Sequence, residues 1–329
     1  MTGPRLTPLA QSLPATVPFV GPEAQERQMK KPFRARLGAN ESVFGPSPAV
    51  VGAMAHAAME TWMYGDPENH DLRQALADSH RVDLENIIVG EGIDGLLGYL
   101  VRLFVGPGDS VVTSDGAYPT FNYHVAGFGG MLHKVPYRDD QEDGIALLAR
   151  ARDVDAKLIY MANPDNPMGT WHDRAAVEAL IANVPDRSLL ILDEAYAQFL
   201  PRIDLPDIDP ANPHVIRLRT FSKAYGMAGA RVGYGIGAQD LIDAFNKVRN
   251  HFGMSRIAQA GALAALNDPG YLTQVIAKVA EARARIAGIA ADNGLTALPS
   301  AANFVTVDCG RDGDFARAVL KGLIGRGVF

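Results

Sequence analysis

Short apolar runs alternate with helix-like segments through the middle of this 329-residue chain, and this alternation is the strongest limit on its fold. The runs end at glycine, proline or small polar residues, and they cover residues 86–89, 110–113, 131–135, 157–161, 188–192, 214–218 and 232–236. Between them, apolar residues recur at helical spacing, as in residues 93–104. Strands separated by helices pair in parallel, so we predict an α/β fold whose mostly parallel sheet carries helices on both faces.

The pattern changes near residue 240. Three long helix-like segments follow, at residues 241–248, 257–266 and 271–291, and then a predicted strand (303–307) and a predicted helix (315–324). We therefore predict a large domain over residues 46–240 and a smaller α/β domain over residues 241–329. Residues 1–45 are predicted to form an N-terminal arm. Its first 32 residues have several prolines and little periodicity, which favours an extended segment that a partner surface would order.

Composition excludes several classes of function. A net charge of −6 gives no electrostatic footprint for nucleic acid. No apolar run is long enough to cross a bilayer, and the N-terminus lacks the pattern of a signal peptide. The single cysteine, Cys309, cannot form an intrachain disulfide and is compatible with a reducing cytoplasm. We expect a cytoplasmic protein that acts on small molecules, without a metal, nucleic-acid or membrane partner.

Residues 219–231 place one lysine among groups that would serve a reactive amine. Thr220 and Ser222 supply hydroxyls beside Lys223, and a glycine-containing run ends at Arg231, whose planar guanidinium suits phosphate oxygens. An isolated lysine is ordinarily a solvated surface charge. Here the neighbours would favour a neutral amine able to attack an aldehyde. A Schiff base with pyridoxal phosphate (PLP) would use all of these groups.

Two polar segments upstream follow apolar runs. Asp193 ends the run at residues 188–192, where α/β sheets place ligand-contacting groups, and it could pair with the protonated pyridine nitrogen of PLP. Tyr196 could hydrogen-bond the ring hydroxyl. Alternatively, the acidic pair Asp193 and Glu194 could cap a helix. Residues 163–170 form a proline-rich turn that presents the amide of Asn166, although an ordinary turn has the same composition.

Residues 90–95 join a predicted strand to a predicted helix through a glycine loop. Small residues there would let backbone N–H groups at the helix start approach a phosphate. The loop also fits the spacing of a nicotinamide-binding fingerprint, but the other motifs argue against a dehydrogenase. Phe121 could stack on a planar ring, and a core position is the alternative.

These segments together resemble the fold-type I PLP-dependent transferases of the aspartate aminotransferase superfamily, and most strongly the histidinol-phosphate aminotransferases. The resemblance runs from about residue 37 to the end of the sequence. It rests on residues 37–42, 64–67, 72–73, 90–95, 119–121, 163–170, 193–196 and 219–231. It implies the fold-type I architecture, PLP as cofactor, and a homodimer with shared active sites.

The resemblance also implies roles for individual residues. Lys223 would carry the cofactor and move the proton, Asp193 would pair with the pyridine nitrogen, and Tyr196 and Asn166 would hold the ring oxygen. Phe121 would stack on the ring. The phosphate would be held by Ser222, Arg231 and the backbone of Gly92, Ile93 and Asp94, assisted by Thr220. Tyr64 would reach the cofactor phosphate of the neighbouring subunit, and Asn40 would lie near the substrate.

The sequence also departs from that family. Asp165 and Met168 replace the usual asparagine and threonine of the turn, residues 92–95 are less polar than usual, and residues 249–255 lack an expected proline-containing turn. No residue matches the arginine that binds the substrate α-carboxylate in that family. We expect that arginine to lie beyond the given sequence.

The resemblance implies a ping-pong transamination from an amino acid or amino-alcohol phosphate to a 2-oxo acid such as 2-oxoglutarate. The donor would be histidinol phosphate, an aromatic amino acid or another amino acid. A PLP-dependent decarboxylase of the threonine-phosphate decarboxylase type would use the same residues, and a PLP-binding module without turnover is a third reading. The retained catalytic residues favour transamination.

Overall fold

The computed structural model describes residues 3–15 and 19–329, so residues 1–2 and 16–18 of the predicted arm lie outside the described part. Its main feature is a seven-stranded sheet in the order β1-β7-β6-β5-β4-β2-β3. The strands are β1 (Ile87–Gly90), β2 (Ser110–Ser114), β3 (Met131–Val135), β4 (Leu158–Ala162), β5 (Leu189–Asp193), β6 (Val215–Thr220) and β7 (Gly233–Ile236). Every predicted strand of the large domain is present, within a residue or two at its ends.

The sheet is parallel from β3 to β6 and antiparallel where β7 pairs with β6 and β1. The predicted mostly parallel α/β sheet is therefore confirmed. The sequence did not indicate that β7 runs in the opposite direction. Because β4, β5 and β6 are parallel neighbours, their carboxyl ends meet at one edge, where Ala162 pairs with Asp193 and Asp193 with Leu218.

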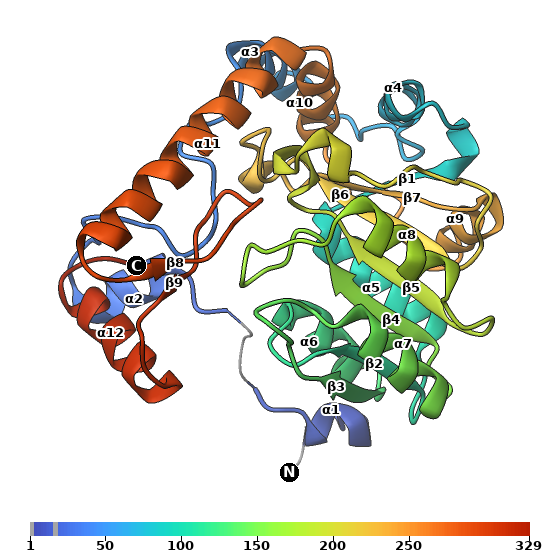
Figure 1. Cartoon of the computed structure of the whole chain (residues 1–329). Helices are drawn as coiled ribbons and strands as arrows, with labels where there is room; N and C mark the ends of the chain where they lie inside the picture. The colour runs from blue at the N-terminus through green and yellow to red at the C-terminus, as the bar shows by residue number, and fades with distance from the viewer. Residues whose placement is uncertain (1–2, 16–18) are drawn as a thin grey trace.

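Helices cover both faces of the sheet, as Figure 1 shows. One face packs on α5 (Gly92–Phe104), α6 (Pro119–Gly127) and α9 (Gln239–Phe245). The opposite face packs on α7 (Gly144–Asp153) and α8 (Arg174–Ala182), and at its β1–β7 end on α4 (His70–His80) and α10 (Arg256–Leu266). Adjacent strand residues face opposite layers: Val111 belongs to the first core and Val112 to the second.

The smaller part of the chain is built around α11 (Pro269–Asp292), the long orange helix in Figure 1. The two-stranded sheet of β8 (Thr296–Ala297) and β9 (Val307–Asp308) and helix α12 (Gly313–Gly325) follow it. The strand predicted over residues 303–307 is wrong in extent, because only its last residue is in β9. Short 3-10 helices complete the chain: η1 (Leu84–Asn86), η2 (Ala197–Phe199), η3 (Arg202–Asp204) and η4 (Ala228–Ala230).

The helices that follow residue 240 do not all leave the large sheet. Leu241, Ile242 and Phe245 of α9 are buried in the core beneath α5. Helix α10 packs against α3 (Pro48–Ala58) and buries Ala258 and Ala262 beside strand residues of β1 and β7. Both α9 and α10 therefore pack on the large sheet, and the boundary near residue 240 stays a prediction.

The described part of the N-terminal arm is partly folded, which corrects the expectation of a wholly extended segment. It contains α1 (Pro8–Ser12) and α2 (Pro22–Met29). After α2, the arm pairs with the last residues of the chain: Arg34 N donates to Gly327 O at 2.7 Å, and Phe329 N donates to Ala35 O at 2.9 Å. This last part of the arm thus packs on the chain's own small domain. None of the helices in the described residues is long and apolar enough to cross a membrane.

Candidate active site

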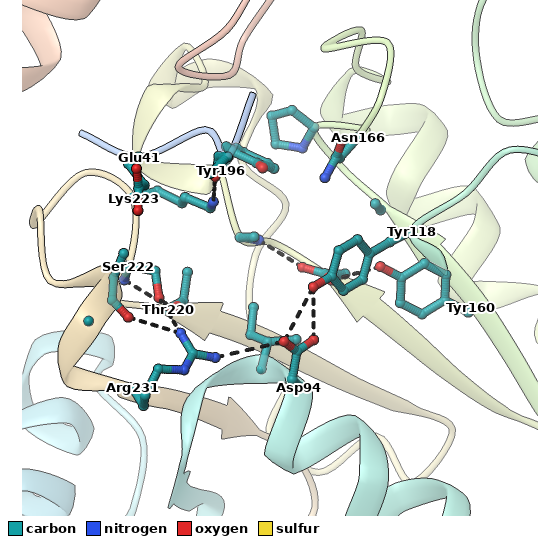
Figure 2. A pocket seen from close by; sticks show the side chains of 18 residues that line it. Glu41, Asp94, Tyr118, Tyr160, Asn166, Tyr196, Thr220, Ser222, Lys223 and Arg231 are labelled. Atoms are coloured by element: carbon teal, nitrogen blue, oxygen red, sulfur yellow. Dashed lines mark hydrogen bonds and ion pairs between the residues drawn. The ribbon is translucent and has the colours of Figure 1, made fainter. Parts of the chain in front are cut away.

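A cavity of about 330 Å³ opens at the carboxyl ends of β4, β5 and β6 (Figure 2). Its walls come from segments far apart in the sequence, because the parallel strands bring their ends to one edge. Among the predicted site residues, the cavity is lined by Ile93, Asp94, Asn166, Asp193, Tyr196, Thr220, Ser222, Lys223 and Arg231. It is also lined by Glu41, Tyr118 and Tyr160, to which the sequence analysis gave no role.

Lys223 lies three residues after the end of β6, and its side chain crosses the cavity. Its Nζ donates to the backbone oxygens of Asn40 at 3.2 Å and Ala39 at 3.4 Å, and it lies 5.6 Å from the centre of the Tyr196 ring. Burial lowers the pKa of Lys223, and the positive charge of Arg231 lowers it further. This setting favours the neutral amine, which is the form that attacks a carbonyl carbon.

Asp193 is the last residue of β5, and only 5% of its surface is exposed. Its Oδ2 accepts a hydrogen bond from the Tyr160 hydroxyl at 2.7 Å, and its Oδ1 accepts one from Ala195 N at 2.9 Å. Burial raises the pKa of Asp193 to about 6, while these two donors oppose the shift. The carboxylate is therefore mainly ionised at pH 7 and can face a cationic group in the cavity.

Glu194 points away from the cavity into a buried ion cluster. Its Oε2 accepts from Arg217 Nε at 3.0 Å and from Arg219 Nε at 2.8 Å, and Arg217 Nη2 lies 2.5 Å from Oε1. Burial alone would raise the pKa of Glu194, but the two guanidinium groups lower it to about 2. A buried charge left without its partner is strongly destabilising, so this cluster fixes the chain directly beside Asp193.

The end of the cavity near α5 is suited to a phosphate. Gly92 has φ +77°, and a Cβ at this position would lie 2.5 Å from Arg231 Nη2. A Cβ on Gly233 would lie 2.7 Å from the backbone of Gly92 and Ile93. These two glycines therefore allow the start of α5, with its free backbone N–H groups, to approach Arg231.

Hydroxyl groups complete the same end of the cavity. Arg231 Nη1 donates to Ser222 Oγ at 3.4 Å, and Thr220 Oγ1 lies 3.0 Å from Ser222 Oγ. The Asp94 carboxylate also contacts this region: Arg231 Nη2 is 3.7 Å from its Oδ2, and the Tyr118 hydroxyl donates to its Oδ1 at 3.0 Å. The guanidinium, hydroxyl and helix N-terminal donors fit a phosphate dianion, with which the Asp94 carboxylate would compete for Arg231.

The structure corrects the role expected of Phe121. Its side chain is 0% exposed and stacks on Tyr160, with ring centroids 4.7 Å apart and an angle of 17° between the planes. It belongs to the core between α6 and the sheet and does not line the cavity. Tyr118, immediately before α6, lines the cavity instead.

Tyr196 and Asn166 lie on the side of the cavity opposite Arg231 in Figure 2. Asn40 Nδ2 donates to the Tyr196 hydroxyl at 3.3 Å, which places Asn40 beside the cavity although it does not line it. The turn that carries Asn166 is fixed by Asp165, whose Oδ2 accepts from Met168 N at 2.9 Å and whose Oδ1 accepts from the Tyr137 hydroxyl at 3.0 Å.

Tyr64 lies outside the cavity of its own chain. Its side chain is 78% exposed, and its ring packs on Phe252 at a centroid distance of 4.7 Å. The resemblance to the histidinol-phosphate aminotransferases implies that Tyr64 reaches the cofactor phosphate of a neighbouring subunit. That role stays a prediction. It requires the Tyr64 side chain to extend from the surface of its own chain into the neighbouring subunit.

Comparisons with known proteins agree with this geometry. The family of class I and II aminotransferases matches residues 35–328. A histidinol-phosphate aminotransferase of Sinorhizobium meliloti, solved in complex with pyridoxal-5'-phosphate, is 56% identical with a TM-score of 0.95, covering 99% of this chain and 88% of that one. Histidinol-phosphate aminotransferases of Moorella thermoacetica and a Ruegeria species are 33% and 37% identical, over 99% and 82% of this chain and 85% and 75% of their own lengths.

Proposed function

The chain belongs to the class I and II aminotransferases and is a PLP-dependent aminotransferase, and we propose that its donor is an amino-alcohol phosphate of the histidinol phosphate type. The acceptor in this proposal is a 2-oxo acid such as 2-oxoglutarate. One observation carries the proposed reaction: a single cavity holds a desolvated lysine, a buried carboxylate and an end suited to the phosphate of PLP. The names of the similar proteins support the choice of donor.

The residues around the cavity fit PLP at three points. Arg231, Ser222 and the start of α5 would hold its phosphate, and Asp193 would pair with its ring nitrogen. Tyr196 and Asn166 would hold its ring oxygen, and Tyr118 would lie against the ring. When bound, PLP supplies an aldehyde that links to amines and a ring that withdraws electrons from the bond being broken.

Lys223 is the group that moves the proton in this proposal. In the first half of the reaction its neutral Nζ removes a proton from the α-carbon of the donor, acting as a general base. In the second half it returns a proton to the α-carbon of the acceptor, so the two halves balance. Because burial and Arg231 lower the pKa of Lys223, the amine can accept this proton near neutral pH.

The donor is tested by steady-state turnover of the PLP-loaded protein with 2-oxoglutarate and a panel of donors. We expect glutamate to form fastest with histidinol phosphate, and more slowly with phenylalanine, tyrosine and histidinol. Turnover only with the aromatic amino acids would overturn the donor and leave the transaminase assignment intact. Release of carbon dioxide without need of 2-oxoglutarate would indicate a decarboxylase and overturn the reaction itself.

We also propose that the active enzyme is a homodimer whose sites are shared. Tyr64 supports this because its ring is exposed and lies outside its own cavity, while the resemblance assigns it to the neighbouring subunit's cofactor. In a two-fold dimer, a residue that crosses the interface does so twice, once for each site. Each site would then need Lys223 from one subunit and Tyr64 from the other.

Mixing inactive Lys223→Ala subunits with inactive Tyr64→Ala subunits is expected to restore activity. In the mixed dimer one site collects both substitutions and the other collects neither, so up to about half of wild-type activity per mixed dimer should return. Mass spectrometry of the mixture confirms that subunits have exchanged. If exchange is complete and activity does not return, Tyr64 does not act across the interface.

A further inference from the structure

Tyr160 places a hydroxyl group at the wall of the cavity, within the otherwise apolar strand β4. It lies in the middle of β4, its side chain is 0% exposed, and its hydroxyl donates to Asp193 Oδ2 at 2.7 Å. Figure 2 shows the ring at the edge of the cavity with the hydroxyl turned inward. A buried hydroxyl is costly unless it is paired, so the contact with Asp193 accounts for a tyrosine at this position.

The ring of Tyr160 is held from its other side. Phe121 stacks on it with an angle of 17° between the planes, and both rings belong to the core beneath α5 and α6. This packing leaves the hydroxyl at a fixed position relative to β5. The stacked ring of Phe121 therefore helps to fix Tyr160, the residue that contacts Asp193.

The charge of Asp193 depends on a small number of neighbours. Burial and the carboxylates of Asp94 and Glu194 raise its pKa, whereas the donors Tyr160 and Ala195 N lower it. Lys223, Tyr118 and Tyr196 face it across the cavity. Of these groups, only Tyr160 is a side chain that donates a hydrogen bond to the carboxylate in the described residues.

We propose that Tyr160 is a positioning residue for the reaction, because its hydroxyl holds the Asp193 carboxylate ionised and directed at the ring nitrogen of PLP. The inference rests on the assignment of Asp193 to that nitrogen. Tyr160 itself does not need to touch the substrate. Loss of its hydroxyl leaves Asp193 with one donor in a desolvated site, where the neutral acid is favoured.

The test is Tyr160→Phe, which removes the hydroxyl and keeps the ring that stacks on Phe121. PLP binding to the cofactor-free protein is measured by fluorescence between pH 5 and 9, and kcat and KM are measured over the same range. We expect the pH below which PLP affinity falls to rise by about one unit, the effect of losing one hydrogen bond to a charge, and we expect kcat to decrease. The donor KM should change less than kcat.

Tyr234→Phe is the matched control. Tyr234 is also a buried strand tyrosine, but its hydroxyl pairs with His80 Nε2 at 3.0 Å and does not contact Asp193. Its substitution should leave the pH dependence unchanged, because it removes no hydrogen bond from Asp193. A wild-type pH dependence of PLP affinity in Tyr160→Phe, or an equal shift in Tyr234→Phe, would overturn the inference.

Asp193→Asn separates this inference from the assignment on which it rests. If Asp193→Asn is nearly inactive and Tyr160→Phe has a wild-type pH profile, Asp193 acts without help from Tyr160, and the inference fails alone. If Asp193→Asn keeps wild-type activity and pH profile, the pairing with the ring nitrogen fails, and the inference fails with it. The assignment of Asp193 and the inference about Tyr160 are both supported by two results together. The fall in PLP affinity at acid pH moves to higher pH in Tyr160→Phe, and it is absent near pH 6 in Asp193→Asn.

Discussion

Lys223→Ala is expected to lose nearly all turnover and still bind PLP. Lys223 is the only lysine that lines the cavity in the part of the chain that the structure describes, so no other amine can replace it there. The loss of a positioned general base alone lowers a rate by about 10²–10⁴-fold, and loss of the covalent link to PLP adds to this. The phosphate and ring contacts of Arg231, Ser222 and Asp193 remain, so PLP should still bind.

Turnover with 2-oxoglutarate and the best donor, together with PLP affinity by equilibrium dialysis, measures both parts of this prediction. Lys157→Ala is the matched control. Its amine is part of a surface ion pair with Asp109 at 2.8 Å, far from the cavity lining, and its loss should leave turnover close to wild type. Lys223→Ala that keeps more than about a hundredth of wild-type turnover would contradict the role of Lys223.

Asp193→Asn is expected to lower transamination by several orders of magnitude. The amide has the size of the carboxylate but carries no charge, so it cannot stabilise a protonated ring nitrogen. The structure gives the pH dependence as well. Burial raises the pKa of Asp193 to about 6 in the cofactor-free protein, so the ionised form that would pair with PLP is lost there as the pH falls through about 6.

The affinity of the wild type for PLP should therefore fall below about pH 6, and the affinity of the variant should lack this dependence on pH. Circular dichroism and thermal unfolding serve as controls, because the fold should be retained. Retention of more than about a tenth of the wild-type rate, which corresponds to about 1.4 kcal/mol of barrier, would indicate a different partner for the ring nitrogen.

Local patterns were sufficient to predict most of the sheet and the centre of the site. Each strand of the large domain is an apolar run that ends at a turn, and Asp193 could be placed at the cavity because it directly follows such a run. Lys223 was recognised from its neighbours Thr220, Ser222 and Arg231, which lie close in sequence. These are local features, and the parallel sheet brings their strands to one edge.

Features that depend on distant contacts could not be predicted. The segment at residues 118–121 holds two aromatic residues, and only the structure shows that Tyr118 lines the cavity whereas Phe121, inside α6, faces the core. Tyr160 lies in a continuous apolar run, and only its hydroxyl group distinguishes it from the other core residues of that run. Its hydrogen-bond partner, Asp193, is 33 residues away in the sequence.

The same limit applies to the domains. The amphipathic pattern of α10 shows that one face is buried but does not show against which element. Its partner is α3, about 200 residues earlier in the chain, a contact that no local pattern indicates. The pairing of residues 34–37 with residues 327–329 likewise joins two ends of the sequence that share no local signal.

The central claim is that Lys223 carries PLP in this cavity. Borohydride reduction of the PLP-loaded protein, followed by proteolysis and mass spectrometry, tests it most directly, because reduction makes the link between lysine and cofactor permanent. A pyridoxyl label is expected on the peptide that contains Lys223. A label on the peptide of Lys157 or Lys247 instead would contradict it.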